Sequence, residues 1–254
     1  MNTNPAVSIV IPAYNESETI QASIARIARN VSLPFEVIVV VDTAEDTTIP
    51  VIEKIQSEIP QVRVEIQDSR GPAAAIKFGF SKAIAPVVIV TMADGSDDPA
   101  SIDTLVELVD RGCVIAAASR YMPGGQQIGG PRFKAFLSRS AGKSLKLFAG
   151  VTTSDATNSY KAYNRAFVEE VGIESDAGFE IAIELVAKAR RLRRPIAEVP
   201  TIWLDRDAGE SRFMLKKWIP KYLKWYRFAY GPELSLDQLK SKQEEENSEG
   251  SRHR

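Results

Sequence analysis

The sequence contains almost no histidine and almost no cysteine, and each absence removes a class of chemistry. The single histidine, His253, is the penultimate residue, so the chain holds no Ser-His-Asp or Cys-His arrangement and no zinc site built on histidines. The single cysteine, Cys113, lies in the apolar run CVIAAAS and excludes a disulfide within the chain. Carboxylates and cationic side chains must therefore carry the chemistry, in what we expect to be a reducing cytosol.

Long hydrophobic runs and an excess of one charge are also missing. No run approaches the roughly 18 apolar residues of a membrane span, and the amino terminus lacks the basic and apolar segments of a signal peptide. The chain has 32 basic and 33 acidic residues, a formal net charge of -1, which gives no argument for a nucleic-acid partner. Its 254 residues, 44% of them hydrophobic, can bury a substantial core. We expect a cytoplasmic protein that is neither secreted nor integral.

Short apolar runs rich in β-branched residues alternate with helical patterns through the first half of the chain. Strands are expected at residues 7–11, 37–41, 62–66, 87–91 and 114–118, with helices at 16–29, 46–58, 72–85 and 99–111. Such alternation predicts an α/β fold, a doubly wound and mostly parallel sheet with helices on both faces. Beyond it we expect helices at 133–149, 164–171 and 178–194 and a strand at 196–204, while PGGQQIGGPR at 123–132 predicts a mobile loop.

Three carboxylates, Asp94, Asp97 and Asp98, follow the fourth apolar run in VVIVTMADGSDDP. Ligands of open α/β sheets bind beyond the carboxyl ends of the strands, where these acids fall. Carboxylate oxygens favour hard ions such as Mg2+ or Mn2+, and these ions commonly bridge phosphates. The sequence therefore predicts a metal site for a phosphorylated substrate.

The turns after the first three apolar runs carry further polar and aromatic residues at the same predicted edge. A nucleoside diphosphate requires aromatic or apolar surface for its base, an acid for a ribose hydroxyl, and cations for its phosphates. Tyr14, Asp42 and Arg70 can supply these in part. Taken one at a time, the same residue types also fit helix caps and turns.

The order VSIVIPAYNES, FEVIVVVDTAEDTT, DSRGPAAAIKFG, VTMADGSDDP resembles the nucleotide-sugar domain of family 2 inverting glycosyltransferases, which have the GT-A fold. In the second half, ASRYMPGG, SDATNSYKAYNR, GFEIAIEL and EVPTIWLDRDAGESR are similar to the polyprenyl-phosphate, dolichol-phosphate mannosyltransferase-like, branch. The resemblance covers residues 7–212. It implies transfer of a sugar from a UDP- or GDP-sugar to a dolichyl or undecaprenyl phosphate, with inversion and a divalent metal, Mg2+ or Mn2+.

The resemblance also implies a role for individual residues at the predicted edge. The donor nucleotide would be bound by Pro12, Tyr14, Glu16, Asp42, Arg70, Gly71 and Asp94. Asp94 would be the metal ligand, but the family commonly has Asp-Ala-Asp where this chain has Met92-Ala93-Asp94, so we expect Asp97 to be the substitute ligand. Asp98 is expected to cap the next helix instead. Thr43 stands where the family usually has the second acid of an Asp-Asp pair.

The nature of the acceptor decides which further side chains are needed. The leaving diphosphate requires positive charge, for which Arg206 and Arg212 are candidates beside the metal. A phosphate acceptor is already largely ionised at neutral pH and needs cations more than a base. The resemblance places Arg120 and Ser159 beside the acceptor, and Arg132 and Lys161 are cations that suit the same task, although Arg132 also fits a solvated loop. A hydroxyl acceptor would need a base, for which Asp155 is the candidate; Asp155 also fits a turn.

The segment 211–231 is basic and aromatic and is expected to form an amphipathic helix. Trp218, Tyr222 and Trp225 follow helical spacing with Lys217, Lys221 and Lys224 on an adjacent face, while Pro220 interrupts the pattern. Such a helix suits the surface of an anionic membrane, or it packs its aromatics onto the domain and leaves its lysines in water. The polar segment 232–254 is expected to be disordered.

The sequence thus predicts a glycosyltransferase domain over 1–210, a basic helix over 211–231 and a tail over 232–254. We expect an enzyme on the cytosolic face of a membrane, in peripheral contact with it and compatible with an integral membrane partner. Two alternatives stay open: a family 2 transferase with a sugar or other hydroxyl acceptor, and a degenerate nucleotide-sugar-binding subunit, suggested by Met92 and Thr43. A Rossmann dehydrogenase is disfavoured because no G-x-G-x-x-G follows the first strand.

Overall fold

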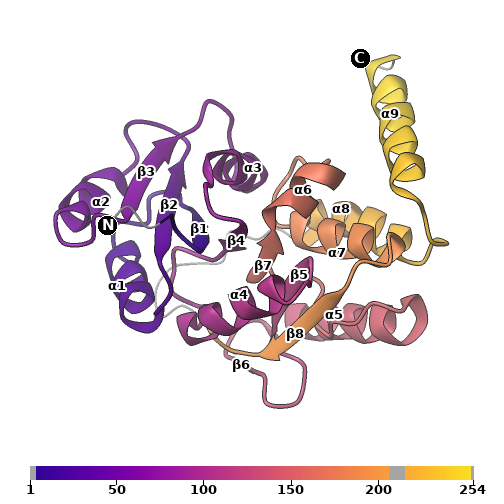
Figure 1. Cartoon of the computed structure of the whole chain (residues 1–254), viewed down its shortest axis with the longest axis horizontal. Coiled ribbons are helices and arrows are strands. Elements are labelled where there is room, and N and C mark those ends of the chain that lie inside the picture. Colours follow the sequence, from indigo (N-terminus) through magenta and orange to yellow (C-terminus); the bar gives the residue numbers. More distant parts are fainter. Residues whose placement is uncertain (1–3, 206–214, 253–254) are drawn as a thin grey trace.

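A seven-stranded sheet runs through the computed structural model, which describes residues 4–205 and 215–252 (Figure 1). The spatial order is β3-β2-β1-β4-β7-β5-β8. Its strands are β1 (Val7–Pro12), β2 (Phe35–Val41), β3 (Val62–Ile66), β4 (Val87–Val90), β5 (Ile115–Ser119), β7 (Lys161–Asn164) and β8 (Ile196–Pro200). Strand β7 runs antiparallel to β4 and β5, and the other pairs are parallel. The predicted doubly wound, mostly parallel sheet is confirmed.

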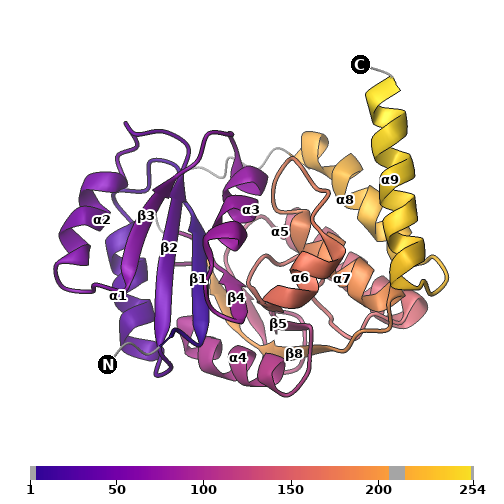
Figure 2. The same cartoon turned by 45° about the horizontal axis from the view of Figure 1, so that its top comes forward.

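Helices cover both faces of this sheet (Figure 2). Along β1, Ile9 and Ile11 face one layer and Val10 faces the other, because successive strand side chains alternate between faces. The first layer contains α1 (Ile20–Asn30), α2 (Ile49–Gln56) and α4 (Ile102–Asp110), which follows the short helix η1 (Pro99–Ser101). The second contains α3 (Pro72–Lys82), α6 (Arg165–Val171), α7 (Ile181–Arg191) and α8 (Leu215–Ala229).

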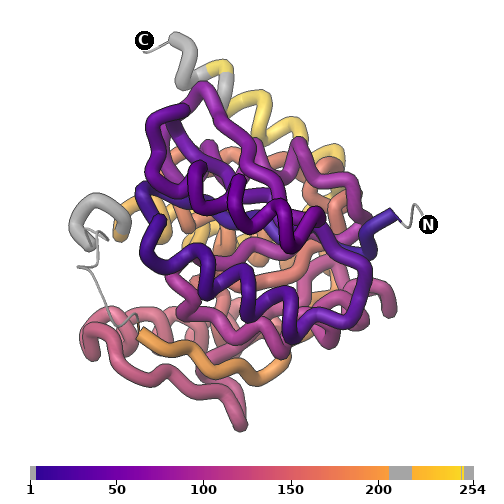
Figure 3. Tube along the Cα trace, turned by 90° about the vertical axis from the view of Figure 1, so that its left-hand side faces the viewer, coloured from indigo at the N-terminus to yellow at the C-terminus, as the bar shows by residue number. Residues whose placement is uncertain are grey.

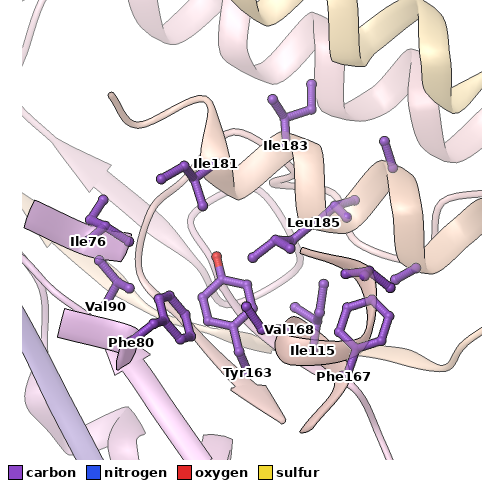
Figure 4. Close-up of a cluster of buried hydrophobic side chains, with 14 of the residues drawn as sticks. Ile76, Phe80, Val90, Ile115, Tyr163, Phe167, Val168, Ile181, Ile183 and Leu185 are labelled. Carbon is purple, nitrogen blue, oxygen red and sulfur yellow. The ribbon is translucent and has the colours of Figure 1, made fainter. Parts of the chain in front are cut away.

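The core of the second layer is built around the antiparallel strand that the sequence analysis missed. Tyr163 of β7 is 1% exposed and packs edge-on against Phe80 of α3, with ring centroids 5.7 Å apart (Figure 4). Ile181 and Leu185 of α7 join the same cluster. Burial of aromatic and branched side chains is the dominant favourable contribution to folding. Strand β7 therefore joins the two parts of the sheet through its side chains as well as its hydrogen bonds.

One loop prediction and one strand prediction require correction. The segment predicted as a mobile loop contains a short strand, β6 (Gln126–Ile128), which pairs in parallel with β9 (Ile202–Leu204). The predicted strand at 196–204 is divided at Thr201, whose carbonyl oxygen accepts a 2.9 Å hydrogen bond from the Gln126 N–H. Backbone pairing thus fixes a segment whose glycines had suggested mobility.

The expectation of a disordered tail is wrong for its described part, because α9 (Leu236–Arg252) is a helix that projects from the body of the molecule (Figures 1 and 2). Leu239 is 1% exposed and belongs to the core. The Gln243 amide donates to the Val171 carbonyl and to Glu174, at 2.8 and 2.9 Å. A few anchoring contacts hold a helix whose composition is otherwise polar.

Helix α8 turns its predicted aromatic stripe toward the protein at the two positions whose side chains are described. Trp225 is 3% exposed and donates a 2.8 Å hydrogen bond to Ser175, and Tyr222 packs beside the same core. Lys221 pairs with Asp176 at 2.9 Å, and Lys224 pairs with an acid of α9 at 2.7 Å. For Tyr222 and Trp225 the alternative in which the aromatics pack onto the domain is the one observed, while the Trp218 side chain lies outside the described part of the structure. Among the described residues, no helix has the length and apolar character needed to cross a bilayer.

Helix α5 (Arg132–Ser144), continued by the turn η2 (Leu145–Ala149), crosses the segment that precedes β7 at very close range. Glycine is required at the crossing, because a Cβ at Gly142 would overlap with the carbonyl oxygen of Ser154. This contact fixes how closely the helix approaches the sheet.

We expect Gly142→Ala to lower the free energy of unfolding by about 1–3 kcal/mol, because the backbone must move to admit the methyl group. Urea denaturation measures the change, with Ser140→Ala on the exposed side of the same helix as the control. Alanine is the better helix former by roughly 0.5–1 kcal/mol, so a stabilised Gly142→Ala protein would show that the helix is free to shift.

Candidate active site

A cavity of about 390 Å³ opens beyond the carboxyl end of β4, between the sheet, α5 and α8. Its polar wall includes Asp94, Asp97, Arg120, Lys134 and Ser159, and its apolar wall includes Leu137, Phe179, Trp203 and Ile219. Strands β1 and β4 are neighbours from which the sheet order runs in opposite directions, a position where α/β sheets bind ligands. The cavity therefore combines acids, cations and apolar surface at the predicted edge.

Asp97 is held at the wall of this cavity by two hydrogen bonds. Its Oδ2 atom accepts from the Thr91 hydroxyl at 2.9 Å and from the Met92 N–H at 3.2 Å, and the residue is only 7% exposed. Burial raises the pKa of Asp97 to about 6, and the nearby Asp94 charge adds to that effect, while both hydrogen bonds oppose it. The carboxyl group is thus positioned to take up a proton just below neutral pH.

Asp94 and Asp97 offer oxygen ligands of the type that Mg2+ and Mn2+ prefer. The Asp94 Oδ1 atom accepts from the Ser96 N–H at 3.0 Å, and the buried Ser96 hydroxyl has no hydrogen-bond partner within residues 4–205 and 215–252. An unpartnered buried hydroxyl on a residue that lines the cavity with Asp94 and Asp97 fits a site that a ligand completes. No cluster of three or more His, Cys, Asp or Glu side chains suited to a metal occurs in the described chain, so substrate oxygens would have to complete the coordination.

Asp98 does not share this site. Its side chain caps η1 by accepting from the Ala100 N–H at 3.2 Å, and it lies 4.0 Å from the Arg26 guanidinium. The prediction that Asp98 is a helix cap is confirmed.

The turns after β2 and β3 are joined by Asp42. Its two oxygens accept from the Gln67 amide at 2.6 Å and from the Gly71 N–H at 3.0 Å, and Arg70 is exposed beside them. Gly71 has a φ of 97°, in the region that favours glycine, so the turn depends on this residue for its shape. Asp42 therefore organises the edge at which a nucleotide was predicted to bind.

The turn after β1 is fixed by an acid that the sequence analysis did not select. Asp46 is 4% exposed and accepts from the Asn15 N–H at 3.0 and 3.2 Å and from the Thr48 N–H at 2.8 Å. Pro12 is buried at the end of β1, Tyr14 is 54% exposed and Glu16 is half-buried. An acid followed two residues later by threonine after a strand was the available signal. The cavity lining does not include Pro12, Tyr14, Glu16, Asp42, Arg70 or Gly71.

Arg120 and Asp155 form a bidentate ion pair under the cavity floor. The Arg120 Nε and Nη2 atoms donate to the two Asp155 oxygens at 2.7 and 2.9 Å, and the Arg120 N–H donates to Asp155 at 3.1 Å. Burial alone would lower the pKa of Arg120, but the Asp155 charge outweighs it and the pKa is raised. Arg120 lines the cavity, whereas Asp155 is completely buried behind it and does not. The geometry gives Asp155 a partner rather than access to a substrate hydroxyl.

Lys161 lies at the start of β7, completely buried, with its ammonium group on the carbonyl oxygens of Ala156 and Asn158. Burial lowers the pKa of Lys161 to about 7, although the Asp155 charge raises it. The segment that it holds includes Ser159, which lines the cavity as expected for an acceptor residue.

The other predicted cations are divided between the surface and the part of the chain outside the described residues. Arg132 is exposed at the first position of α5 and is not among the cavity residues, whereas Lys134, two positions later, lines the cavity and was missed. Both residues lie in the same basic segment. They differ in the side of the helix on which each side chain lies, and only the side of Lys134 borders the cavity. Arg206 and Arg212 lie outside the described residues.

Solved structures share this fold. Glucosyl-3-phosphoglycerate synthase from Mycobacterium tuberculosis, in complex with Mn2+, UDP and glucosyl-3-phosphoglycerate, aligns with a TM-score of 0.64 at 19% identity, over 91% of this chain and 82% of that one. Its complex with Mg2+ and UDP aligns with a TM-score of 0.61 at 19% identity, over 91% and 81% of the two chains. The likeness shows the fold alone, and with the sheet order it confirms the predicted GT-A class.

The chain belongs to glycosyl transferase family 2, whose model matches residues 8–172. Dolichol-phosphate mannosyltransferase from Pyrococcus furiosus is 29% identical, over 86% of this chain but only 64% of that protein, so the chain spans less than two thirds of that relative. Polyprenol monophosphomannose synthase from Mycolicibacterium smegmatis is also 29% identical, over 80% of this chain and 79% of that protein. The predicted family and enzyme class are confirmed.

We expect Asp97→Asn to weaken Mn2+ binding by at least about tenfold, because an amide replaces an ionised ligand. In the wild-type protein, affinity falls as the pH drops through about 6, since the proton competes with the ion for Asp97. Electron paramagnetic resonance of free Mn2+, with UDP or GDP present, measures both effects. Asp98→Asn is the matched control, and an equal loss in that variant, or no pH dependence, would contradict the assignment.

We expect Asp155→Asn to lower the free energy of unfolding by about 3–5 kcal/mol, because it leaves the Arg120 charge buried without its partner. Thermal and urea unfolding measure this effect. An Asp155→Asn protein of unchanged stability that had lost turnover would instead return Asp155 to the role of a base.

Proposed function

We propose that this protein transfers a sugar from a UDP- or GDP-sugar to a polyprenyl phosphate, with inversion at the sugar and with Mg2+ or Mn2+ as cofactor. The observation that carries the proposal is the composition of one cavity, in which Asp94 and Asp97 occupy the same space as Arg120 and Lys134. Acids suit a metal-bound diphosphate and cations suit a phosphate acceptor.

On the donor side, Asp94 and Asp97 would hold the divalent ion, which when bound would neutralise charge on the departing diphosphate. The turn ordered by Asp42 presents exposed Arg70, and the turn ordered by Asp46 presents exposed Tyr14. These two side chains are suited to phosphate and base, respectively. We retain Arg206 and Arg212 as candidate cations for the same leaving group.

On the acceptor side, a phosphate oxygen is already a charged nucleophile and needs orientation more than proton removal. Arg120 is fixed by Asp155, so its guanidinium is positioned before any ligand arrives, and Ser159 is a candidate hydrogen-bond donor to the phosphate. The apolar wall formed by Leu137, Phe179 and Ile219 suits the first isoprene units of a lipid chain.

The names of the relatives favour mannose as the sugar that is transferred. The proteins from Pyrococcus furiosus, Mycolicibacterium smegmatis and Micrococcus luteus are a mannosyltransferase, a phosphomannose synthase and a mannosyltransferase, each named for a polyprenyl or dolichyl phosphate. We therefore place GDP-mannose first among the donors to be tested.

The decisive experiment incubates the purified chain with GDP-mannose, UDP-glucose and other nucleotide sugars, with Mn2+ or Mg2+ and a polyprenyl phosphate. Mass spectrometry detects the lipid-linked sugar. We expect a metal-dependent product that Asp94→Asn reduces by at least about a hundredfold, with Asp98→Asn as the control.

Two results would overturn the proposal. A product formed only with free sugars or other hydroxyl compounds would assign a different acceptor to the same fold. Nucleotide-sugar binding without turnover on any acceptor would favour the degenerate binding subunit, with Met92 as the altered position.

A further inference from the structure

Helix α5 and its continuation η2 present two faces of different character. The inner face lines the cavity through Lys134, Leu137 and Ala141. The outer face is exposed at Phe133 and Phe136, and the helix lies at the lower right edge of the molecule in Figure 1. One element thus borders the candidate acceptor cavity on one side and solvent on the other.

Large apolar side chains are concentrated on the outer face. No other described segment of the same length exposes as many of them. Phe133 and Phe136 are each 64% exposed, Leu147 is 74% exposed and Phe148 is 76% exposed. Single exposed apolar residues are ordinary, but four within sixteen residues of one helical segment indicate a surface with a partner.

The charge of this segment is of one sign. No acidic residue occurs from Arg111 to Ser154. Arg132, Arg139 and Lys143 are exposed together with the aromatic residues of α5. The next acid along the chain, Asp155, is buried against Arg120.

Within the described ranges 4–205 and 215–252, one acid of another element is paired with a cation of α5 or η2. Lys146 of η2 pairs with Glu198 of β8 at 2.7 Å, which neutralises that one cation of the segment. On α8, by contrast, Lys221 and Lys224 are both paired with acids, and Trp225 is buried. Among the side chains that the structure describes, α5 therefore exposes aromatic residues beside basic ones, whereas Trp225, Lys221 and Lys224 of α8 are buried or paired.

We propose that the outer face of α5 and η2 docks on the surface of an anionic phospholipid bilayer. Phe133, Phe136, Leu147 and Phe148 enter the boundary between headgroups and acyl chains, and Arg132, Arg139 and Lys143 contact the lipid phosphates. Aromatic and aliphatic residues with cations and no acid are typical of a helix that lies in the membrane interface.

The inner face of the same helix gives the docking a consequence for the cavity. When the outer face lies on a bilayer, the wall formed by Lys134 and Leu137 is one helix diameter, about 10 Å, from the lipid surface. A phosphate on a membrane lipid would then be close to Arg120. This consequence rests on the proposed function, whereas the docking itself does not.

The test is sedimentation of the purified full chain with vesicles, and it needs neither donor nor acceptor. We expect binding to vesicles of phosphatidylcholine with about one third phosphatidylglycerol and little binding to phosphatidylcholine alone. Phe136→Ser should weaken partitioning about tenfold, and so should Phe148→Ser, because each variant lacks an aromatic side chain that would be buried in the bilayer interface. Arg132→Gln and Lys143→Gln should each weaken it about fivefold.

Matched control variants test whether the effect belongs to this face. Ile84→Ser removes an apolar side chain that is 62% exposed elsewhere, and Lys221→Gln removes a cation of α8. Both should sediment as the wild-type chain does, and circular dichroism should show that every variant is folded. The proposal is overturned if the wild-type chain does not bind anionic vesicles, if the α5 variants bind unchanged, or if the controls lose as much.

Turnover assays separate this proposal from the preceding one. With a short, water-soluble polyprenyl phosphate, Phe136→Ser should retain wild-type turnover, whereas with a long-chain acceptor in vesicles it should lose activity in proportion to its partitioning. Equal loss with both acceptors would contradict docking by this face. Vesicle binding without turnover on any acceptor would retain the docking surface and overturn the proposed reaction.

Discussion

The ion pair between Arg120 and Asp155 is the interaction on which the candidate site depends. Arg120 follows β5 and Asp155 precedes β7, so the pair joins two strands that are neighbours in the sheet but distant along the chain. A bidentate pair at 2.7 and 2.9 Å fixes the plane of the guanidinium as well as its position. Because the partner is completely buried, removing it would leave a charge without compensation, and the geometry is correspondingly rigid.

The carboxylates of this fold are divided between ordering the backbone and facing the cavity. Asp42, Asp46 and Asp98 accept hydrogen bonds from backbone N–H groups, and each thereby shapes a turn or a helix start at the same edge of the sheet. Asp94 and Asp97 also accept such bonds but remain at the cavity wall. The division explains how an edge rich in acids can offer a site for a single ion, because three of these acids shape the backbone away from the cavity while Asp94 and Asp97 share its wall.

The predictability of each element followed the strength of its local pattern. Strands β1, β2 and β4 are continuous apolar runs and were located within two residues, because a strand buried on both faces has few other readings. Strand β7 was missed because it is four residues long and includes the buried Lys161, whose charge conceals the strand pattern. Helix α9 was missed because Leu239 is a rare apolar anchor in a polar segment. In both cases tertiary contacts, not local sequence, decide the structure.

Site residues followed a similar rule. One cavity is lined by four residues that were predicted from the sequence, namely Asp94, Asp97, Arg120 and Ser159. Their prediction was possible because the ends of strands and the family motifs pointed to the same positions. The sequence could not show that Lys134, and not Arg132, lines the cavity. Two cations two residues apart point to different sides of a helix, and the sequence does not give the orientation of that helix. Asp155 was considered as a base because its sequence context shows a carboxylate but not its partner, which lies thirty-five residues earlier in the chain.

Helices α5 and α8 both carry aromatic residues on an amphipathic pattern, but α5 exposes them on its outer face and α8 packs Trp225 onto the protein. On α8 the protein supplies both the apolar surface and the acids, so Trp225 and the neighbouring lysines are satisfied within the chain. On α5 the inner face is satisfied by the sheet and the cavity, while Phe136 and Phe148 remain in water. Exposed aromatic surface of this kind is favourable only where a second apolar phase is available. Helix α5 presents this exposed aromatic surface on one side and borders, on its other side, the cavity in which the proposed phosphate acceptor would react.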